Sequence, residues 1–141
     1  MTQQLPLGEL AFTRAGDKGD TSDVTVFAPD RAVYDIVVEQ VTPERVAACY
    51  GELVQGSVHR YEVPNVLAVK FVLERALGGG GPSSLRADNL GKAMGGPILR
   101  LSITVPDEVA AQASGRPRPS RDPYAEAAWV VERAGSAHNG R

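Results

Sequence analysis

The 141-residue chain contains little of what small proteins use to cross-link a fold or to bind a metal. It has one cysteine, Cys49, which excludes an internal disulfide, and no cluster of cysteines and histidines has the spacing of a zinc site. Cys49 lies among alanines without the signature of a nucleophile. A chain of this length can bury a core without such devices. We therefore expect a cytoplasmic protein that uses no metal and no cofactor.

Long apolar runs and an excess of basic residues are missing as well. No window approaches the roughly 18 consecutive apolar residues of a membrane-spanning helix, and the opening MTQQLPLGEL lacks the basic and apolar regions of a signal peptide. A net charge of −2 argues against the basic surface that nucleic-acid-binding proteins usually carry. The expected partners are small molecules or proteins, and neither nucleic acid nor membrane.

Alternating apolar and polar residues predict four strands. We expect them over 8–14, 23–28, 57–63 and 98–105. The stretch TRAGDKGDTSD, which joins the first two, contains glycines and many charges and predicts a wide, charged loop. The last strand has a polar face that should meet solvent or a partner, formed by Arg100, Ser102 and Thr104.

Helical signals fall between these strands. Pro29 is placed to begin one helix, and Thr42 and Gly51 are placed to cap a second. Apolar residues at helical spacing predict a third helix over 66–77, and we expect a short fourth over 83–95.

Together these elements predict the α+β class, a small and largely antiparallel four-stranded sheet with helices packed on one face. We assign the domain to residues 1–110 and a linker and tail to residues 111–141. The segment SGRPRPSRDP is rich in proline and arginine and has little that could enter a core. The following YAEAAWVVERAG could form a short helix with Trp129, which would dock on this domain or on a neighbouring subunit, or would stay free.

Glycine and lysine are concentrated together in two places. Nine of the fifteen glycines and two of the three lysines fall within residues 16–19 and 78–96. Glycine exposes amide N–H groups and an adjacent lysine adds positive charge, a combination that suits a phosphate or a carboxylate. The same residues could equally end helices and lie solvated on the surface, so both interpretations stand on this pattern alone.

Sharper motifs are absent. LGKAM places Ala93 after Lys92, where a Walker A loop needs serine or threonine, and no GxGxxG begins a helix after a strand. The spacing of Asp17, Asp20 and Asp23 does not fit an EF-hand. A magnesium site on one or two of these carboxylates stays an alternative, but such aspartates more often bind backbone amides in turns or pair with Arg14 and Lys18.

Four stretches are together similar to a known family: TRAGDKGDTSD, RYEVPNVLAVKFVLERALGGGG, SLRADNLGK and ILRLSITVP. Over roughly residues 8–106 they resemble the C-terminal ferredoxin-like domain of the acyclic-terpene-utilisation protein AtuA, which also occurs as separate small proteins. The resemblance implies a ferredoxin-like fold and a link to the breakdown of branched terpenoid acids and to acyl-CoA metabolism. It implies less about this small domain, whose biochemical role in the family is poorly defined.

The charged loops and the positions matched to the family define the expected site. Its expected catalytic residues are Asp17, Lys18 and Asp88. Its expected ligand-binding residues are Arg14, Gly16, Gly19, Arg60, Asn65, Gly79, Gly80, Arg86 and Lys92. The resemblance also marks two departures, because this chain carries Asp23 and Lys70 where an asparagine is common in the family.

The sequence leaves three functions open and does not decide whether the chain is an enzyme. The first is binding of an acyl-CoA or carboxylate by arginine and lysine, with an aspartate as general base for lyase or hydratase chemistry beside a thioester carbonyl. The second is a non-catalytic subunit that docks on a larger AtuA-type protein or on itself, as a homo-oligomer. The third is a stand-alone biosynthetic enzyme that reuses the fold.

Overall fold

The structure of the protein is a computed structural model that describes residues 1–80 and 94–116. Within these ranges the elements follow in the order β1 (Thr2–Pro6), η1 (Leu7–Glu9), β2 (Phe12–Lys18), β3 (Thr21–Phe27), α1 (Arg31–Gln40), α2 (Pro43–Tyr50), η2 (Gly51–Leu53), β4 (Val58–Val63), η3 (Pro64–Val66), β5 (Ala68–Leu73), α3 (Gly95–Leu99), β6 (Ser102–Pro106) and α4 (Asp107–Ser114), where η marks a 3-10 helix. None of the helices described is long and apolar enough to cross a bilayer.

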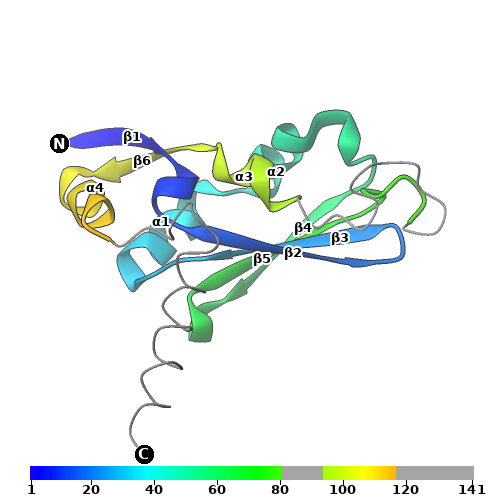
Figure 1. Cartoon of the computed structure of the whole chain (residues 1–141), viewed down its shortest axis with the longest axis horizontal. Helices are drawn as coiled ribbons and strands as arrows, with labels where there is room; N and C mark the ends of the chain where they lie inside the picture. The colour runs from blue at the N-terminus through cyan, green and yellow to red at the C-terminus, as the bar shows by residue number, and fades with distance from the viewer. Residues whose placement is uncertain (81–93, 117–141) are drawn as a thin grey trace, which may run out of the picture.

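Four strands form an antiparallel sheet in the order β2-β3-β5-β4, and β1 pairs with β6 in a separate two-stranded sheet (Figure 1). Helices α1, α2 and α3 contact β5, β4 and β2 respectively, and α4 contacts β1 and β6. The core lies between the four-stranded sheet and the first three helices, where Val24 and Phe71 are fully buried. The expected α+β class, with helices on one face of a four-stranded sheet, is therefore confirmed.

The helix predicted over 66–77 is wrong. The chain forms η3 there and then β5, which lies between β3 and β4 in the sheet. Val69 and Phe71 point into the core, while Lys70 and Val72 point to the other face. A central strand carries apolar residues on both faces, and such a run cannot be distinguished from a buried helix by its pattern alone.

The stretch TRAGDKGDTSD is not a wide loop. Strand β2 continues to Lys18 and β3 begins at Thr21, so the hairpin turns on Gly19 and Asp20 alone. Gly19 has φ of +60°, a positive value that two-residue hairpin turns require. The first strand, expected over 8–14, lies instead over Phe12–Lys18 as β2. The charges of residues 14–18 suggest a loop in the sequence, but β2 is an edge strand, and edge strands commonly carry charged side chains.

The predicted beginnings of the first two helices are correct in part. Thr42 Oγ1 accepts a hydrogen bond from the Arg45 N–H at 3.3 Å, so the predicted cap of α2 is confirmed. The cap of α1 is Asp30 and not Pro29, because the Asp30 carboxylate accepts the Val33 N–H at 2.9 Å.

Of the other expected elements, the strand over 57–63 is confirmed as β4, whereas the strand over 98–105 is shortened to β6 by the helix α3. Residues 83–93 of the expected fourth helix lie outside the described residues. Helix α4 continues past residue 110 to Ser114.

Candidate functional site

The β2–β3 turn is bound to the glycine-rich segment that follows β5. Asp20 Oδ1 accepts hydrogen bonds from the N–H groups of Leu77 and Gly79, at 3.0 and 2.8 Å. The Asp20 carbonyl oxygen accepts a third from the Ala76 N–H at 2.8 Å. We call Gly19, Asp20 and residues 76–80 the turn clamp, because these bonds hold the two segments together.

The two backbones of the turn clamp are in direct contact. A Cβ atom placed on Gly80 would lie 2.9 Å from the Gly19 carbonyl oxygen, and Gly80 has φ of +100°. Both the close approach and the backbone conformation therefore require glycine. The structure brings together Gly19, Gly79 and Gly80, three of the expected ligand-binding residues, although they are about sixty positions apart in the chain.

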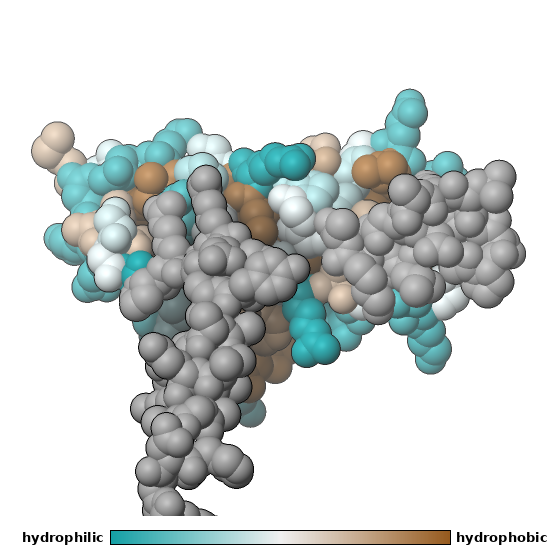
Figure 2. All heavy atoms as spheres, in the orientation of Figure 1, coloured by the Kyte–Doolittle hydropathy of each residue, from teal (hydrophilic) through white to brown (hydrophobic). Residues whose placement is uncertain are grey.

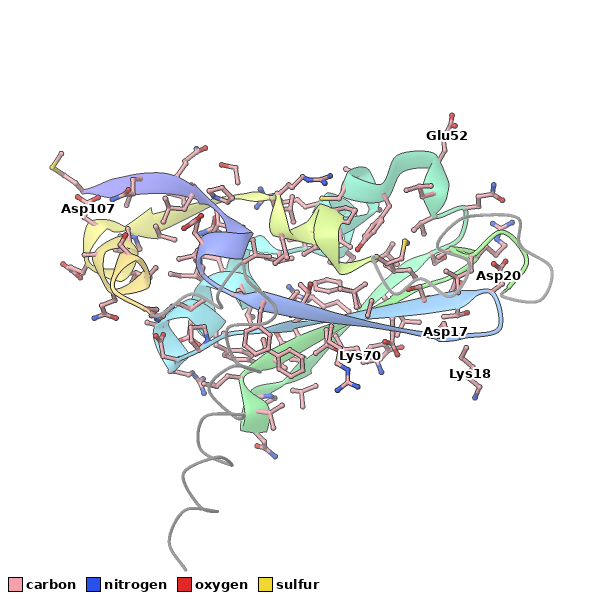
Figure 3. All side chains as sticks on the ribbon, viewed as in Figure 1. Asp17, Lys18, Asp20, Glu52, Lys70 and Asp107 are labelled. Atoms are coloured by element: carbon pink, nitrogen blue, oxygen red, sulfur yellow. The ribbon has the colours of Figure 1, made fainter. Side chains whose placement is uncertain are left out.

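The expected cations of β2 lie on the sheet face that points away from the helices. Arg14 and Lys18 are both exposed, and neither forms an ion pair with another described residue. Figure 3 shows Lys18 close to the turn and on the same side of the sheet as Lys70. Asp17 points to the opposite face, beside Ser22, so Asp17 and Lys18 approach the end of the strand from two sides.

Two other expected ligand-binding residues lie away from the turn clamp. The guanidinium of Arg60 donates to the carbonyl oxygens of Val38 and Val41, at 2.7 and 3.2 Å, and so caps the end of α1. Asn65 lies in η3, at the end of β5 opposite the turn clamp, which for a strand of six residues is roughly 17 Å away. The structure therefore gives Arg60 a structural contact and places Asn65 at a different edge of the sheet.

The third expected group, Arg86, Asp88 and Lys92, lies outside the described residues. The described chain resumes at Met94, whose carbonyl oxygen accepts a hydrogen bond from the Tyr50 hydroxyl. Helix α3 then packs on β2.

Asp23 and Lys70, the two expected departures from the family pattern, contact each other. Lys70 Nζ lies 3.1 Å from Asp23 Oδ2, across the neighbouring strands β5 and β3. Gly16 leaves room for this carboxylate, because a Cβ atom there would lie 2.8 Å from Asp23 Oδ1. The two charges therefore compensate each other on the open side of the sheet.

Because both side chains are partly exposed, we expect Lys70→Asn and Asp23→Asn each to lower the free energy of unfolding by less than about 1 kcal/mol. The double variant should lose less than the sum of the two, since it removes both charges. Urea unfolding of the four proteins at low and high salt measures this coupling, which should shrink with salt. A coupling that salt leaves unchanged would contradict an electrostatic origin.

Cysteine chemistry has no support at this site. Burial raises the pKa of the Cys49 thiol, and the nearby Arg45 charge opposes that rise only in part. Burial, reinforced by Cys49, also raises the pKa of the Tyr50 phenol. Cys49 is thus mainly a thiol at neutral pH, as expected for a structural residue. No group of three or more potential metal ligands occurs among the residues that the structure describes.

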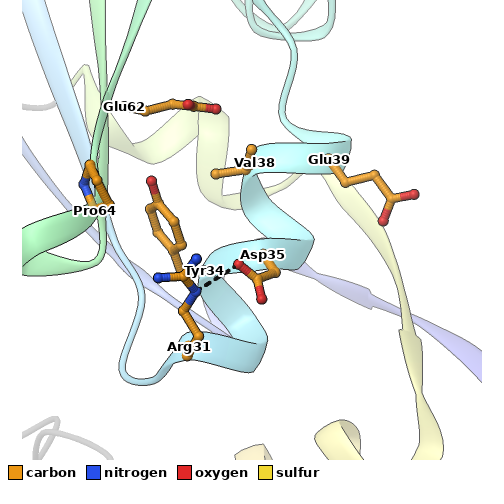
Figure 4. A pocket seen from close by; sticks show the side chains of 7 residues that line it. All are labelled: Arg31, Tyr34, Asp35, Val38, Glu39, Glu62 and Pro64. Carbon is orange, nitrogen blue, oxygen red and sulfur yellow. Dashed lines mark hydrogen bonds and ion pairs between the residues drawn. The ribbon is translucent and has the colours of Figure 1, made fainter.

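A separate hollow of about 380 Å³ lies beside α1 and the end of β4 (Figure 4). Two of its charged groups pair with each other: Arg31 Nε lies 3.0 Å from Asp35 Oδ1, and the Arg31 guanidinium lies over the Tyr34 ring at 5.3 Å. None of the expected site residues lines this hollow, so it is distinct from the turn clamp.

A sequence profile of the AtuA ferredoxin-like domain matches residues 5–104. The chain belongs to the AtuA ferredoxin-like domain family. The matched range begins in β1 and ends in β6, so it contains both sheets and the turn clamp of this AtuA-like domain. Comparisons with curated proteins and with solved structures give no match.

The most important residue that sequence reasoning missed in this AtuA-like domain is Asp20. The sequence predicts it, with Asp17 and Asp23, as a turn aspartate, which describes its chemistry correctly but not its partners. The available signal was the pair Gly19-Asp20 between two alternating segments, a common two-residue hairpin turn. Its amide partners lie in a distant glycine run, which no local pattern connects to the turn.

Proposed function

We propose that this AtuA-like domain binds an acyl-CoA, or a related carboxylate or phosphate, at the turn clamp. The observation that carries the proposal is the hydrogen bonding of Asp20 to Leu77 and Gly79, which joins the two glycine- and lysine-rich segments. Lys18 supplies an exposed positive charge next to the turn, where Gly19 and Gly79 are exposed as well. Arg86 and Lys92, which follow Gly80 in the chain, are proposed as further cations of the same site.

Lyase or hydratase chemistry extends this proposal. Removal of a proton beside a thioester carbonyl needs a base within hydrogen-bonding reach and a donor for the developing enolate oxygen. Asp17 or Asp88 is the proposed base and Lys18 the proposed hydrogen-bond donor. The proposed location of the protein is the cytoplasm. Binding is the primary function in this proposal, and turnover depends on it.

Isothermal titration with coenzyme A, short and branched acyl-CoAs, inorganic phosphate and a dicarboxylate tests the proposal. We expect saturable binding of the acyl-CoAs, weakened about tenfold in Lys18→Ala by the loss of one charge-assisted hydrogen bond. Lys70→Ala is the matched control, because Lys70 lies on the same face but is paired with Asp23, and it should bind nearly as the wild type does. Absence of saturable binding for every ligand would overturn the proposal.

A second candidate is a non-catalytic subunit that docks on a larger AtuA-type protein. The observation that favours it is the exposed polar face of β6, where Ser102 and Thr104 point outward. The outer edge of β6 is already occupied, because Gln40 exchanges two hydrogen bonds with the Thr104 backbone, at 2.7 and 2.9 Å. Docking would therefore use side chains and not strand addition. Co-expression with a larger AtuA-type chain should give a complex on size exclusion that Thr104→Arg weakens.

A further inference from the structure

The four-stranded sheet has one face that the described helices do not cover. Helices α1, α2 and α3 all pack on the other face. Phe12, on β2, is 61% exposed and Tyr61, on β4, is 55% exposed. We call this surface, made by alternate residues of the four strands, the open face. Apolar surface lies beside hydrophilic side chains along the lower side of the molecule, where Lys18 and Lys70 also point (Figures 2 and 3).

The open face has an apolar end. The rings of Phe12 and Phe27 stack at 5.2 Å with an interplanar angle of 13°. Val63, on β4, is exposed at the same end of the sheet, and Val66 is exposed on the adjoining η3. Single exposed apolar residues need no explanation, but a contiguous cluster on one sheet face indicates an interface.

Strand pairing arranges the open face in rows. The first row crosses the sheet as Phe12, Phe27, Ala68 and Val63, and is apolar throughout. The second row crosses it as Arg14, Thr25, Lys70 and Tyr61. In each row the first residue lies on the edge strand β2 and the last on the opposite edge strand β4.

We propose that the open face is the interface of a homodimer, with a two-fold axis that runs parallel to the strands between β3 and β5. This axis places β2 of one copy over β4 of the second copy. The apolar rows then face each other, and Arg14 of one copy lies over the Tyr61 ring of the second, where a guanidinium binds well. Arg14 is exposed on β2, and the structure shows no ion pair between it and another described residue.

The side chains of the two rows favour this axis over the alternative, and they favour a second copy of the chain as the binding partner. An in-plane axis perpendicular to the strands would place the apolar row over the row of Lys18, which would bury a charge against Phe12. Under the parallel axis the Lys70 charge stays paired with Asp23 of its own chain. The open face is thus complementary to itself in one arrangement.

The size of the open face lies near the lower limit of specific interfaces. Four strands about 4.8 Å apart and about six residues long, at about 3.3 Å each, give a face of roughly 19 by 20 Å. Two such faces with their side chains approach the roughly 1,000 Å² at the lower limit of specific interfaces. We therefore expect a weak dimer with a dissociation constant in the micromolar range.

Sedimentation equilibrium of the full chain over a range of concentrations tests the dimer without any ligand, so its result is independent of the proposed anion site. Arg14→Glu and Tyr61→Arg should each weaken the dimer at least about tenfold, the loss of one cation–π contact plus a repulsion. The double variant Arg14→Glu/Tyr61→Arg should recover dimerisation. Within one copy the two residues lie three strand spacings apart, roughly 14 Å, so the recovery can only come from pairing between copies.

Arg31→Glu is the matched control, because it makes the same charge change on α1 and should leave the dimer intact. Circular dichroism and the melting temperature verify that each variant folds. A monomer at every concentration would overturn the proposal. If Arg14→Glu dimerises as the wild type does, the interface lies elsewhere. If the double variant does not recover dimerisation, the two-fold arrangement is excluded. Either result also overturns the proposal.

Discussion

Asp20→Ala is expected to cost the protein about 3 kcal/mol of its free energy of unfolding. The variant removes the carboxylate that accepts the N–H groups of Leu77 and Gly79. Leu77 is fully buried, so its N–H group would lose its acceptor without gaining water. A buried donor without a partner costs about 1–3 kcal/mol, and bonds to a charged acceptor lie at the upper end of such values.

Asp20→Asn is the matched control for this prediction. Its amide oxygen can still accept one or both N–H groups but carries no charge, so we expect about half the loss. The urea midpoint of the three proteins measures the difference, and the melting temperature of Asp20→Ala should fall by roughly 10–20 °C. If both variants unfold within about 0.5 kcal/mol of the wild type, a range typical of surface substitutions, the turn clamp does not hold the fold.

Gly80→Ala should be the second most damaging change in the described part of the turn clamp. At φ of +100° a side chain strains the backbone, and its Cβ would lie 2.9 Å from the Gly19 carbonyl oxygen. The neighbouring atom belongs to the backbone of a tight turn and cannot rotate away. We expect a loss of about 2–3 kcal/mol, since strain of this kind costs about 1–3 kcal/mol before any displacement of the turn.

Gly19→Ala separates strain from contact. Gly19 also has a positive φ, +60°, but nothing lies within 4 Å of a Cβ placed there. This variant should therefore lose only about 1 kcal/mol, the usual cost of a left-handed residue that is not glycine. Chemical unfolding measures both variants. Equal losses would show that strain alone acts and that the two backbones do not press on each other.

Local signals account for the parts of the fold that the sequence predicts. Helix α2 has its cap residue Thr42 and a proline at its first position, and both act within one turn. Strand β4 has clear alternation because it is an edge strand with exposed side chains. By contrast, β5 is defined by neighbours on both sides of the sheet, and its apolar residues match a helix equally well.

In the candidate site, too, local signals are visible in the sequence and long-range contacts are not. Composition alone groups Gly19 with Gly79 and Gly80, and the structure places Gly80 against Gly19 and bonds Gly79 to the neighbouring Asp20. The partners of Asp20 could not be predicted, because Leu77 lies 57 residues away and only the folded sheet brings it there. Arg60 resembles a free cation in sequence, yet it pairs with Glu62 and donates to the last carbonyl groups of α1, and no pattern in the chain identifies these carbonyl partners.

The most direct test of the turn clamp as a binding site is an NMR titration of the ¹⁵N-labelled protein with an acyl-CoA. We expect the amide signals of Gly19, Asp20, Gly79 and Gly80 to shift together and to saturate with one affinity. The same titration of Lys18→Ala should need about tenfold more ligand. Saturable shifts confined to β6 and α3, or no shifts at ligand concentrations that saturate other acyl-CoA-binding proteins, would contradict the account.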